Sequence, residues 1–295
     1  MNWQDFDWLL DASLEEDAAR RDVTTRALVA VDRQAAAEIR ARAAGVICGL
    51  PLARRLAERF GQHLEFEEGA RDGDRVAAGA VVARLRGPAA SILSTERTML
   101  NFLQRLSGVA TLTALFVEKV KGTNSRIYDT RKTTPGWREL EKYAVRCGGG
   151  RNHRMHLADQ ALIKDNHLAL LGGGPEAVNV AVSRVRAACP GLIVEVEVEN
   201  LAELEAALTA APDVIMLDNM RPEQVREAAA LVSKMVGNGK RPVLARNGKR
   251  PLLESSGTIT LSDVRAYAEA GADRISIGAL THSAPALNLS LDLIA

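Results

Sequence analysis

The spacing of apolar residues changes along the N-terminal part of the chain. It opens with apolar residues at helical spacing, Trp3, Phe6, Leu9 and Leu10, which predict a helix over residues 1 to about 25. Short apolar runs between glycines and charged turns then predict strands, at Ala36–Ile39, Gly45–Cys48 and Ala80–Leu85. A helix near Pro51–Phe60, ended by Gly61, interrupts them.

A longer helix is predicted from Ser94 to Val120. Its apolar residues recur at helical spacing, and they are Met99, Phe102, Leu103 and Leu106. The same spacing leaves Arg97, Asn101 and Arg105 on a more polar face. We expect this helix to connect a small α+β domain to the rest of the chain.

The second half alternates short apolar runs with helical segments. The runs predict strands at Arg126–Asp129, Ala161–Lys164, Ile193–Glu197, Val214–Asp218, Leu252–Ser256 and Ile275–Gly278. Helices are predicted between most of them, at Pro175–Cys189, Leu201–Ala211, Pro222–Val236 and Ser262–Gly271. Strand and helix in alternation are typical of a parallel sheet. A complete eightfold barrel takes about 250 residues, so this shorter span predicts an α/β barrel of six or seven strands.

Ionisable residues end several of these predicted strands. They are Asp129, Lys164, Glu197 and Asp218. In α/β barrels the chemistry gathers at the C-terminal ends of the strands. The pattern therefore predicts that these side chains share one site.

Composition narrows the class of protein. The chain is 47% hydrophobic and 25% charged, which is ordinary for a globular protein. Its formal net charge of +1 excludes a general attraction to nucleic acid or anionic membrane. We see no apolar run of about 18 residues, and the N-terminal segment is acidic. Three cysteines without CxxC spacing argue against a disulfide framework and a cysteine metal site. We expect a cytoplasmic protein.

The stretch from Asp129 to His167 is locally basic. It holds eight basic and five acidic residues, a local charge of +3. Arg131 and Lys132 stand side by side, and His153 and Arg154 follow three consecutive glycines. Arginine offers a planar fork for carboxylate or phosphate and lysine a compact charge, so the pattern favours a small anionic ligand. A solvated charged loop is the alternative interpretation.

Carboxylates form the second half of the candidate site. Glu197 and Asp218, at successive strand ends, suit Mg²⁺ held through water and shared with substrate phosphates, or direct contacts to ribose hydroxyls. They are equally consistent with salt bridges to the basic stretch. Glu195, Glu197 and Glu199 alternate along one strand and share a face, so the pattern leaves open which of them points to the ligand.

Two further patterns concern phosphate and zinc. Small residues end the last two predicted strands, at Ser255–Gly257 and Ile277–Ala279, where barrels commonly bind phosphate through backbone N–H groups. His153 and His156 lack a third ligand at a convincing spacing, so we do not expect zinc.

A tandem repeat runs from residue 238 into the predicted strand Leu252–Ser256. Residues 238–245 read Asn-Gly-Lys-Arg-Pro-Val-Leu-Ala, and residues 247–254 read Asn-Gly-Lys-Arg-Pro-Leu-Leu-Glu. We interpret the first copy as a surface loop, because loops tolerate insertions.

Several uncommon motifs occur together and in order. They are Asp129-Thr-Arg-Lys-Thr-Thr-Pro-Gly, Lys142-Tyr-Ala-Val, Gly148-Gly-Gly-Arg-Asn-His-Arg, Leu162-Ile-Lys-Asp-Asn-His, Glu195-Val-Glu-Val, Leu217-Asp-Asn, Glu254-Ser-Ser-Gly and Gly278-Ala-Leu-Thr-His. In these motifs the chain closely resembles quinolinate phosphoribosyltransferase, also called carboxylating nicotinate-nucleotide pyrophosphorylase. The resemblance runs from Asp22-Val-Thr-Thr to Leu291, and only the Asn238–Arg246 copy departs from it.

The resemblance implies a fold, an assembly and a reaction. The fold would be an N-terminal α/β sandwich domain over residues 1–110, joined by the C-terminal tail 283–295, and a partly open six- to seven-stranded α/β barrel over residues 111–282. Two subunits would form a homodimer in which one N-terminal domain covers the other subunit's barrel mouth. The enzyme would transfer phosphoribosyl from phosphoribosyl pyrophosphate to quinolinate with Mg²⁺, giving nicotinate mononucleotide, pyrophosphate and CO₂.

The resemblance also implies roles for single residues. Arg97 would reach quinolinate from the neighbouring subunit, and the residues that bind its carboxylates would be Arg131, His153, Arg154 and Lys164. The residues that hold phosphoribosyl pyrophosphate and Mg²⁺ would be Lys132, Glu197, Asp218, Ser256, Gly257 and Gly278. Further substrate contacts are expected at Thr133, Thr258, Ile277, Ala279 and His282. Catalysis is expected to rest on Lys132, Lys164, Glu197 and Asp218.

Three alternatives remain on the sequence alone. Two are paralogues on the same fold, namely a molybdenum-operon protein and a nicotinate phosphoribosyltransferase. Against the second, Arg97, Arg154 and Lys164 together favour a diacid over a mono-acid substrate. The third is a non-catalytic sensor of a phosphorylated anion. Glu197 and Asp218 argue against the sensor, because a pure anion binder gains nothing from carboxylates at its mouth.

Overall fold

The structure is a computed structural model, and it describes residues 1–61, 63–237, 245 and 248–294. The chain divides into two compact units. The first comprises Met1–Ala114, Leu140–Gly149 and Ser283–Ala295, and the second comprises Leu115–Glu139 and Gly150–His282. The boundary expected at residue 110 falls within a long helix, and a short segment from the middle of the chain groups with the first unit.

The first unit is built on an antiparallel four-stranded sheet in the order β12-β1-β5-β3. Its strands are β1 (Gln34–Ala41), β3 (Glu65–Glu68), β5 (Val81–Pro88) and β12 (Leu289–Ile294), and a separate pair joins β2 (Gly45–Val46) to β4 (Arg75–Val76). The chain's last strand pairs with β1 from Ala36↔Ile294 to Ala41↔Leu289. The C-terminal tail is therefore an edge strand of this sheet.

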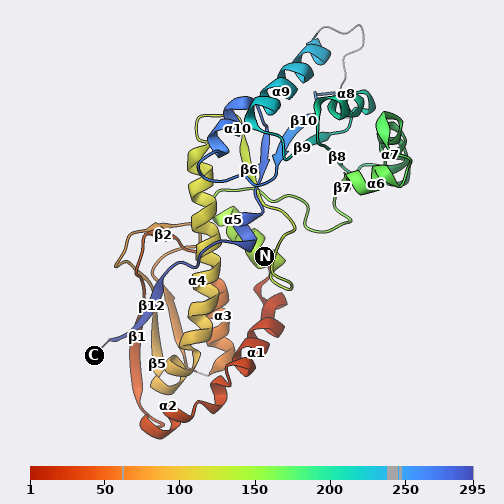
Figure 1. The fold of residues 1–295 in the computed structure, drawn as a ribbon. Coiled ribbons are helices and arrows are strands. Elements are labelled where there is room, and N and C mark those ends of the chain that lie inside the picture. The colour runs from red at the N-terminus through yellow and green to blue at the C-terminus, as the bar shows by residue number, and fades with distance from the viewer. Residues whose placement is uncertain (62, 238–244, 246–247, 295) are drawn as a thin grey trace. The chain divides into compact units, whose positions relative to one another are not determined.

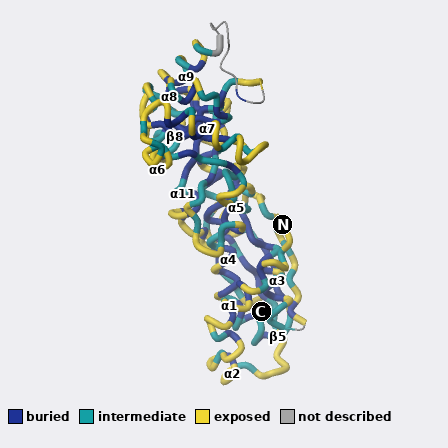
Figure 2. The backbone as a smooth tube through the Cα atoms, turned by 90° about the vertical axis from the view of Figure 1, so that its right-hand side faces the viewer, coloured by how far each residue is buried: buried dark blue, intermediate teal, exposed yellow. Residues whose placement is uncertain are grey.

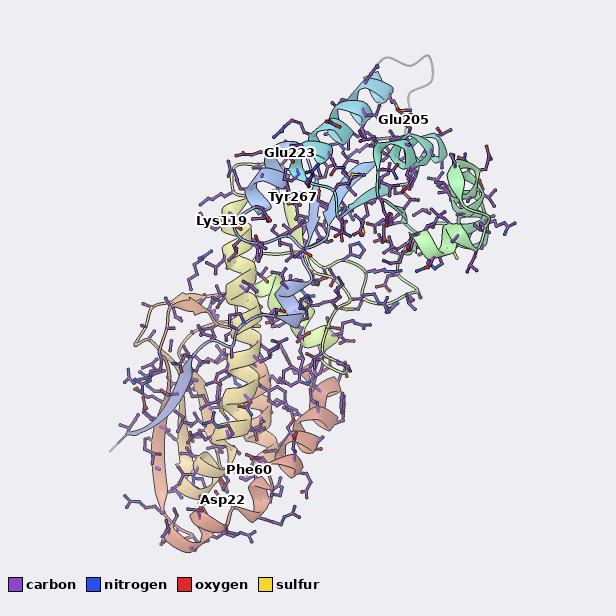
Figure 3. All side chains as sticks on the ribbon, viewed as in Figure 1. Asp22, Phe60, Lys119, Glu205, Glu223 and Tyr267 are labelled. Atoms are coloured by element: carbon purple, nitrogen blue, oxygen red, sulfur yellow. The ribbon has the colours of Figure 1, made fainter. Side chains whose placement is uncertain are left out.

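The helices of this unit carry its apolar core. They are η1 (Trp3–Phe6), α1 (Asp7–Glu16), η2 (Ala19–Arg21), α2 (Val23–Leu28), α3 (Leu50–Phe60), most of α4 (Ala89–Lys119) and most of α5 (Arg138–Cys147). The helix expected over residues 1–25 is broken, because Ala18 adopts the left-handed conformation with φ 49°. Asp22, labelled in Figure 3, then caps α2 by accepting a hydrogen bond of 3.0 Å from the Thr25 N–H.

Helix α4 is the one place where the described chain has the length and composition of a membrane span. We did not expect such a segment from the sequence. Its most apolar window is 61% buried inside the protein, and Met99, Leu103 and Leu106 are completely enclosed. A core helix of a soluble protein has these properties, so the segment is weak evidence for a membrane.

The second unit is a six-stranded parallel sheet in the order β6-β11-β10-β9-β8-β7 (Figure 1). Its strands are β6 (Arg126–Tyr128), β7 (Ala161–Ile163), β8 (Val194–Val198), β9 (Val214–Asp218), β10 (Leu252–Ser256) and β11 (Arg274–Ser276). The helices are α6 (Asp165–Ala169), α7 (Gly174–Ala188), α8 (Leu201–Ala210), α9 (Pro222–Gly237), α10 (Val264–Ala270) and α11 (Ala279–His282). The central strands β8 and β9 are almost entirely buried, and β8 is dark blue in Figure 2.

This sheet confirms the expected α/β fold with a partly open barrel. Within the described residues no ladder closes the sheet between its edge strands β6 and β7. Arg151 adds a single parallel bridge to Tyr128 beyond β6, which is the only trace of a seventh strand in this part of the chain. Most of the first copy of the tandem repeat, residues 238–244, lies outside the described residues.

Candidate active site

A cavity of about 660 Å³ opens at the C-terminal ends of the parallel strands. All of its lining residues belong to the second unit. Charged and histidine side chains line it, and they are Arg131, Lys132, His153, Arg154, Lys164, Glu197, Asp218 and His282. Cations thus outnumber carboxylates, which makes the cavity a natural place for an anion.

The strand β6 positions the basic segment through a buried carboxylate. Asp129 is completely buried, and its Oδ1 accepts a hydrogen bond of 2.9 Å from the His153 backbone N–H. Its other oxygen accepts one of 2.5 Å from the Asn152 amide. Asp129 therefore fixes the segment that carries His153 and Arg154, and the cavity lining does not include it.

His153 lies against two buried glutamates inside the barrel. Its Nε2 is 3.0 Å from Glu195 Oε2 and 3.3 Å from Glu254 Oε1. Both carboxylates have no exposed surface. Gln160 donates a hydrogen bond to Glu195, and Ser276 donates one to Glu254. These donors surround the two carboxylates, so the three groups form a hydrogen-bonded charge cluster.

This cluster sets the charge of His153. Burial by itself would lower the pKa of His153, but the hydrogen bonds and charges of Glu195 and Glu254 outweigh it and raise the pKa to about 10. Burial and the charge of Glu254 raise the pKa of Glu195 to about 7. His153 therefore presents an imidazolium cation to the cavity at neutral pH.

Among the described residues, no carboxylate forms an ion pair with Arg131 or Arg154 in the cavity, although the charges of Glu195 and Asp159 act on Arg154. Burial and the nearby charge of Arg131 lower the pKa of Arg154, which means that the two guanidinium groups repel each other. The Arg131 Nε is buried and makes no hydrogen bond within the described part of the chain. Buried N–H donors are normally paired with an acceptor. An anionic ligand between Arg131 and Arg154 would offset the repulsion of the two guanidinium groups and would accept a hydrogen bond from the Arg131 Nε.

The carboxylates occupy neighbouring strands. Glu197 on β8 is level with Met216 on β9, so Glu197 and Asp218 project from the same face of the sheet. Glu197 Oε2 accepts a hydrogen bond of 2.8 Å from Lys164 Nζ, and Asp218 Oδ2 accepts one of 2.6 Å from the Asn219 amide. Glu197 is thus the member of the alternating glutamates that lines the cavity, since Glu195 is enclosed and Glu199 is exposed.

The loops after the last two strands approach the cavity closely. Gly257 has φ +136°, and a Cβ there would lie 2.7 Å from Asn219 Oδ1. A Cβ on Gly278 would lie 3.0 Å from the Lys132 side chain and 3.1 Å from His282 Nε2. Gly257 is therefore unfavourable for any other residue, whereas a side chain at Gly278 would press on the Lys132 and His282 side chains.

Two models of known protein families match nearly the whole chain. The model described as the N-terminal domain of quinolinate phosphoribosyl transferase matches residues 22–107, and the model for its C-terminal domain matches residues 109–292. The chain belongs to the quinolinate phosphoribosyltransferase family. This confirms the resemblance that the motifs predicted.

Individual members of the family are similar over almost their full length. The nicotinate-nucleotide pyrophosphorylase (carboxylating) of Mycobacterium leprae is 41% identical over 274 residues, covering 92% of this chain and 91% of that protein. A probable enzyme of the same name from Bacillus subtilis is 38% identical, covering 99% and 95%. The structure of the nicotinate-nucleotide pyrophosphorylase from Francisella tularensis matches with a TM-score of 0.87 and 36% identity, covering 100% of this chain and 98% of that chain.

Most residues expected from the family resemblance line the cavity together. Besides the charged side chains and His282, these are Ser256, Gly257, Thr258, Ile277, Gly278 and Ala279. Thr133 is not among the lining residues; its Oγ1 accepts a hydrogen bond of 3.1 Å from Arg138 Nε. Arg97 is an exposed residue of α4 in the first unit, so it does not line the cavity either.

Sequence reasoning missed several polar and apolar residues of the lining. They are Thr130, Leu162, Met216, Asn219, Ile259, Thr260 and Ser276. Most lie within or directly after the predicted strands, so their position was a usable signal. His156, considered with His153 for zinc, pairs instead with Asp159 at 2.6 Å.

Proposed function

We propose that this protein is a quinolinate phosphoribosyltransferase, which converts quinolinate and phosphoribosyl pyrophosphate into nicotinate mononucleotide, pyrophosphate and CO₂ for NAD biosynthesis. Family membership over the full chain supports this function. The observation that carries it is the single cavity in which cationic side chains and two carboxylates meet at parallel strand ends.

The cations suit a ligand with two adjacent carboxylates. We assign quinolinate to the region of Arg131, Arg154, Lys164 and His153. The two guanidinium groups offer planar forks, Lys164 adds a third donor, and the protonated imidazole adds a fourth. A mono-acid would leave one of the half-buried guanidinium groups without an anionic partner, which is costly.

The remaining lining residues suit phosphoribosyl pyrophosphate and Mg²⁺. We assign the phosphates to Lys132 and to the backbone around Gly257 and Gly278. Glu197 and Asp218 supply the hard oxygen ligands that Mg²⁺ prefers, and no group of three ligand side chains includes them within the described residues. A site with two carboxylates fits Mg²⁺ bound through water or substrate phosphates. Bound there, Mg²⁺ would neutralise charge on the pyrophosphate.

The chain's side chains would act by positioning and by charge. The pyridine nitrogen of quinolinate already has a lone pair, so it attacks the anomeric carbon without a general base. Lys132 offsets the charge of the departing pyrophosphate, and the carboxylates of Glu197 and Asp218 favour the positively charged sugar. The positively charged pyridinium nitrogen then stabilises the electron pair left on the adjacent ring carbon as its carboxylate leaves as CO₂, and a proton from solvent adds to that carbon to give nicotinate mononucleotide.

We also propose the assembly implied by the family resemblance. In a homodimer, Arg97 of one subunit would contact quinolinate bound to the other. The exposure of Arg97 on α4 supports this, together with its absence from the lining of the cavity in its own chain. The family consists of soluble enzymes, and we expect the protein to act in the cytoplasm.

A turnover assay with two competing acids tests the function. Purified protein with Mg²⁺ and phosphoribosyl pyrophosphate should release CO₂ and pyrophosphate from quinolinate, and chelation of Mg²⁺ should stop the release. Nicotinate, which lacks the second carboxylate, should give little nucleotide. Turnover of nicotinate but not of quinolinate would reject the proposal in favour of the mono-acid enzyme.

A further inference from the structure

A second cluster of reactive side chains lies in the first unit, among residues with no assigned role in the proposed reaction. It joins Cys48 before α3, Asp72 in the turn after β3, and Cys147 at the end of α5. One ligand atom from each residue, the sulfur in the two cysteines, lies within 4.8 Å of the other two. Cys48 is fully buried, whereas Cys147 is only partly covered. Two thiols distant in sequence thus lie close together, and one of the two residues, Cys147, is partly exposed.

The backbone around both cysteines is held in place. The Cys48 N–H donates a hydrogen bond of 3.0 Å to Ser107 Oγ on α4. Gly73 donates one of 2.8 Å to the Ile47 carbonyl, and a Cβ on Gly73 would lie 3.6 Å from the Cys147 carbonyl oxygen. Gly148 packs so tightly that an added Cβ would lie 2.4 Å from the Ala110 carbonyl oxygen. The sulfurs are therefore held near each other by tertiary structure.

A metal ion is the first alternative for such a cluster, and the hydrogen bonds of Asp72 argue against it. The carboxylate accepts hydrogen bonds of 3.0 Å from the N–H groups of Gly49 and Leu50 at the start of α3. It also accepts one of 2.9 Å from the Tyr143 hydroxyl. A metal would have to displace these donors, and the cluster would still supply only three of the four ligands of a structural zinc site.

We propose that Cys48 and Cys147 are a reversible thiol–disulfide pair that is oxidised by small disulfides. Cys147 is the attacking thiol, because it is partly exposed, and Cys48 is the resolving thiol behind it. Cys147 directly precedes the segment 148–154, which carries His153 and Arg154 into the active site.

The reaction is a double thiol–disulfide exchange. The Cys147 thiolate attacks one sulfur of a disulfide such as oxidised glutathione, and the other half leaves as a thiolate. Cys48 then loses its proton and attacks Cys147 sulfur, which expels the second half as a thiol. The protein loses two hydrogen atoms, and the small disulfide is reduced to two thiols.

The electrostatics give the two thiols different roles. A hydrogen bond from Cys48, with a contribution from the charge of Arg146, lowers the pKa of Cys147 although burial opposes the shift. Burial raises the pKa of Cys48. Cys147 therefore forms the thiolate first, as an attacking thiol must.

The experiment uses the full chain with Cys189→Ser, which removes the exposed third thiol. Oxidised glutathione should remove two hydrogens from the intact protein, and peptide mapping should find Cys48 joined to Cys147. The disulfide should raise Tm by about 5 °C or more and dithiothreitol should reverse the change. In the Cys48→Ala variant, Cys147 should keep a bound glutathione. If that variant does not fold, Cys147→Ser should leave Cys48 reduced.

Three results would overturn the proposal. One is a stable glutathione adduct on Cys147 with Cys48 intact beside it. Another is the absence of any reaction until the protein unfolds. The third is stoichiometric Zn²⁺ binding by the reduced protein that is lost in both cysteine variants. None of these measurements uses turnover of quinolinate, so they are independent of the proposed function.

Discussion

Lys164 Nζ and Glu197 Oε2 lie 2.8 Å apart, and this contact joins the basic half of the cavity to its acidic half. The lysine follows β7 and the glutamate lies on the adjacent strand β8. The lysine side chain is 45% exposed, so the pair adds little to folding stability. The pair instead determines position, because Glu197 holds the Lys164 ammonium group between the proposed sites of the two substrates.

Removing one cavity cation should weaken use of quinolinate without unfolding the protein. We expect Arg154→Ala and Lys164→Ala each to lower kcat/KM for quinolinate by roughly 10- to 150-fold, since a charged hydrogen bond contributes about 1.5–3 kcal/mol. Steady-state kinetics with quinolinate varied measures this effect. Arg265→Ala is the matched control, because Arg265 pairs with Glu269 on the surface of α10. Equal losses in all three variants would contradict the assignment.

The charge of His153 should depend on its buried glutamates. The pKa of His153 is raised to about 10, so the cation is present below that pH and is lost as the pH rises through it. In Glu254→Gln one carboxylate is removed and the pKa of His153 should fall toward its ordinary value of about 6.5. We expect kcat/KM for quinolinate to decline at a pH lower by one unit or more in this variant.

The same substitution should change how stability depends on pH. Because the folded-state pKa of His153 is raised, its proton stabilises the fold fully below about pH 6.5 and this contribution disappears as the pH approaches 10. Urea unfolding of wild type between pH 6.5 and 10 should therefore show a steeper loss of stability than Glu254→Gln. Glu269→Gln, on the surface, should follow wild type. Parallel curves for wild type and Glu254→Gln would show that His153 is not held as a cation.

The glycine at the end of β10 should be required for phosphoribosyl pyrophosphate. Gly257→Ala places a Cβ 2.7 Å from Asn219 Oδ1 at φ +136°, so the loop and Asn219, which follows Asp218, must move apart. We expect KM for phosphoribosyl pyrophosphate to rise about tenfold or more. Gly172→Ala is the control, because it has φ +96° but no neighbour within 4 Å. It introduces a Cβ at positive φ without a steric clash and should leave this KM unchanged.

The strands of the second unit were predictable because their signals are local. Val214–Asp218 was predicted with the bounds that β9 has, since a buried parallel strand is a continuous apolar run between helices. β3 (Glu65–Glu68) was missed, because its acidic sequence gives no strand pattern. It is instead stabilised by pairing with β5, where Glu67 is level with Arg84.

The positions of the site's charges followed from strand ends, but their partners did not. His153, Glu195 and Glu254 come from three distant segments, and they meet only because β8 and β10 flank β9 in a fixed register. The alternation of Glu195, Glu197 and Glu199 predicted that their side chains share one face of the strand. It did not predict how deep in the barrel each side chain lies. Depth separates the enclosed Glu195 from Glu197 at the cavity, and it depends on how the whole sheet curves.

Mixed dimers provide the sharpest test of the proposed role of Arg97. Arg97→Ala alone and Lys164→Ala alone should each be nearly inactive with quinolinate at low concentration. After subunit exchange, half of the dimers should be mixed, and each of these has one site with both residues intact. Activity should therefore recover to about a quarter of the wild-type value. Two differently tagged subunits verify the exchange by co-purification. If exchange occurs and activity does not recover, Arg97 acts within its own subunit or not at all, and the shared site is excluded.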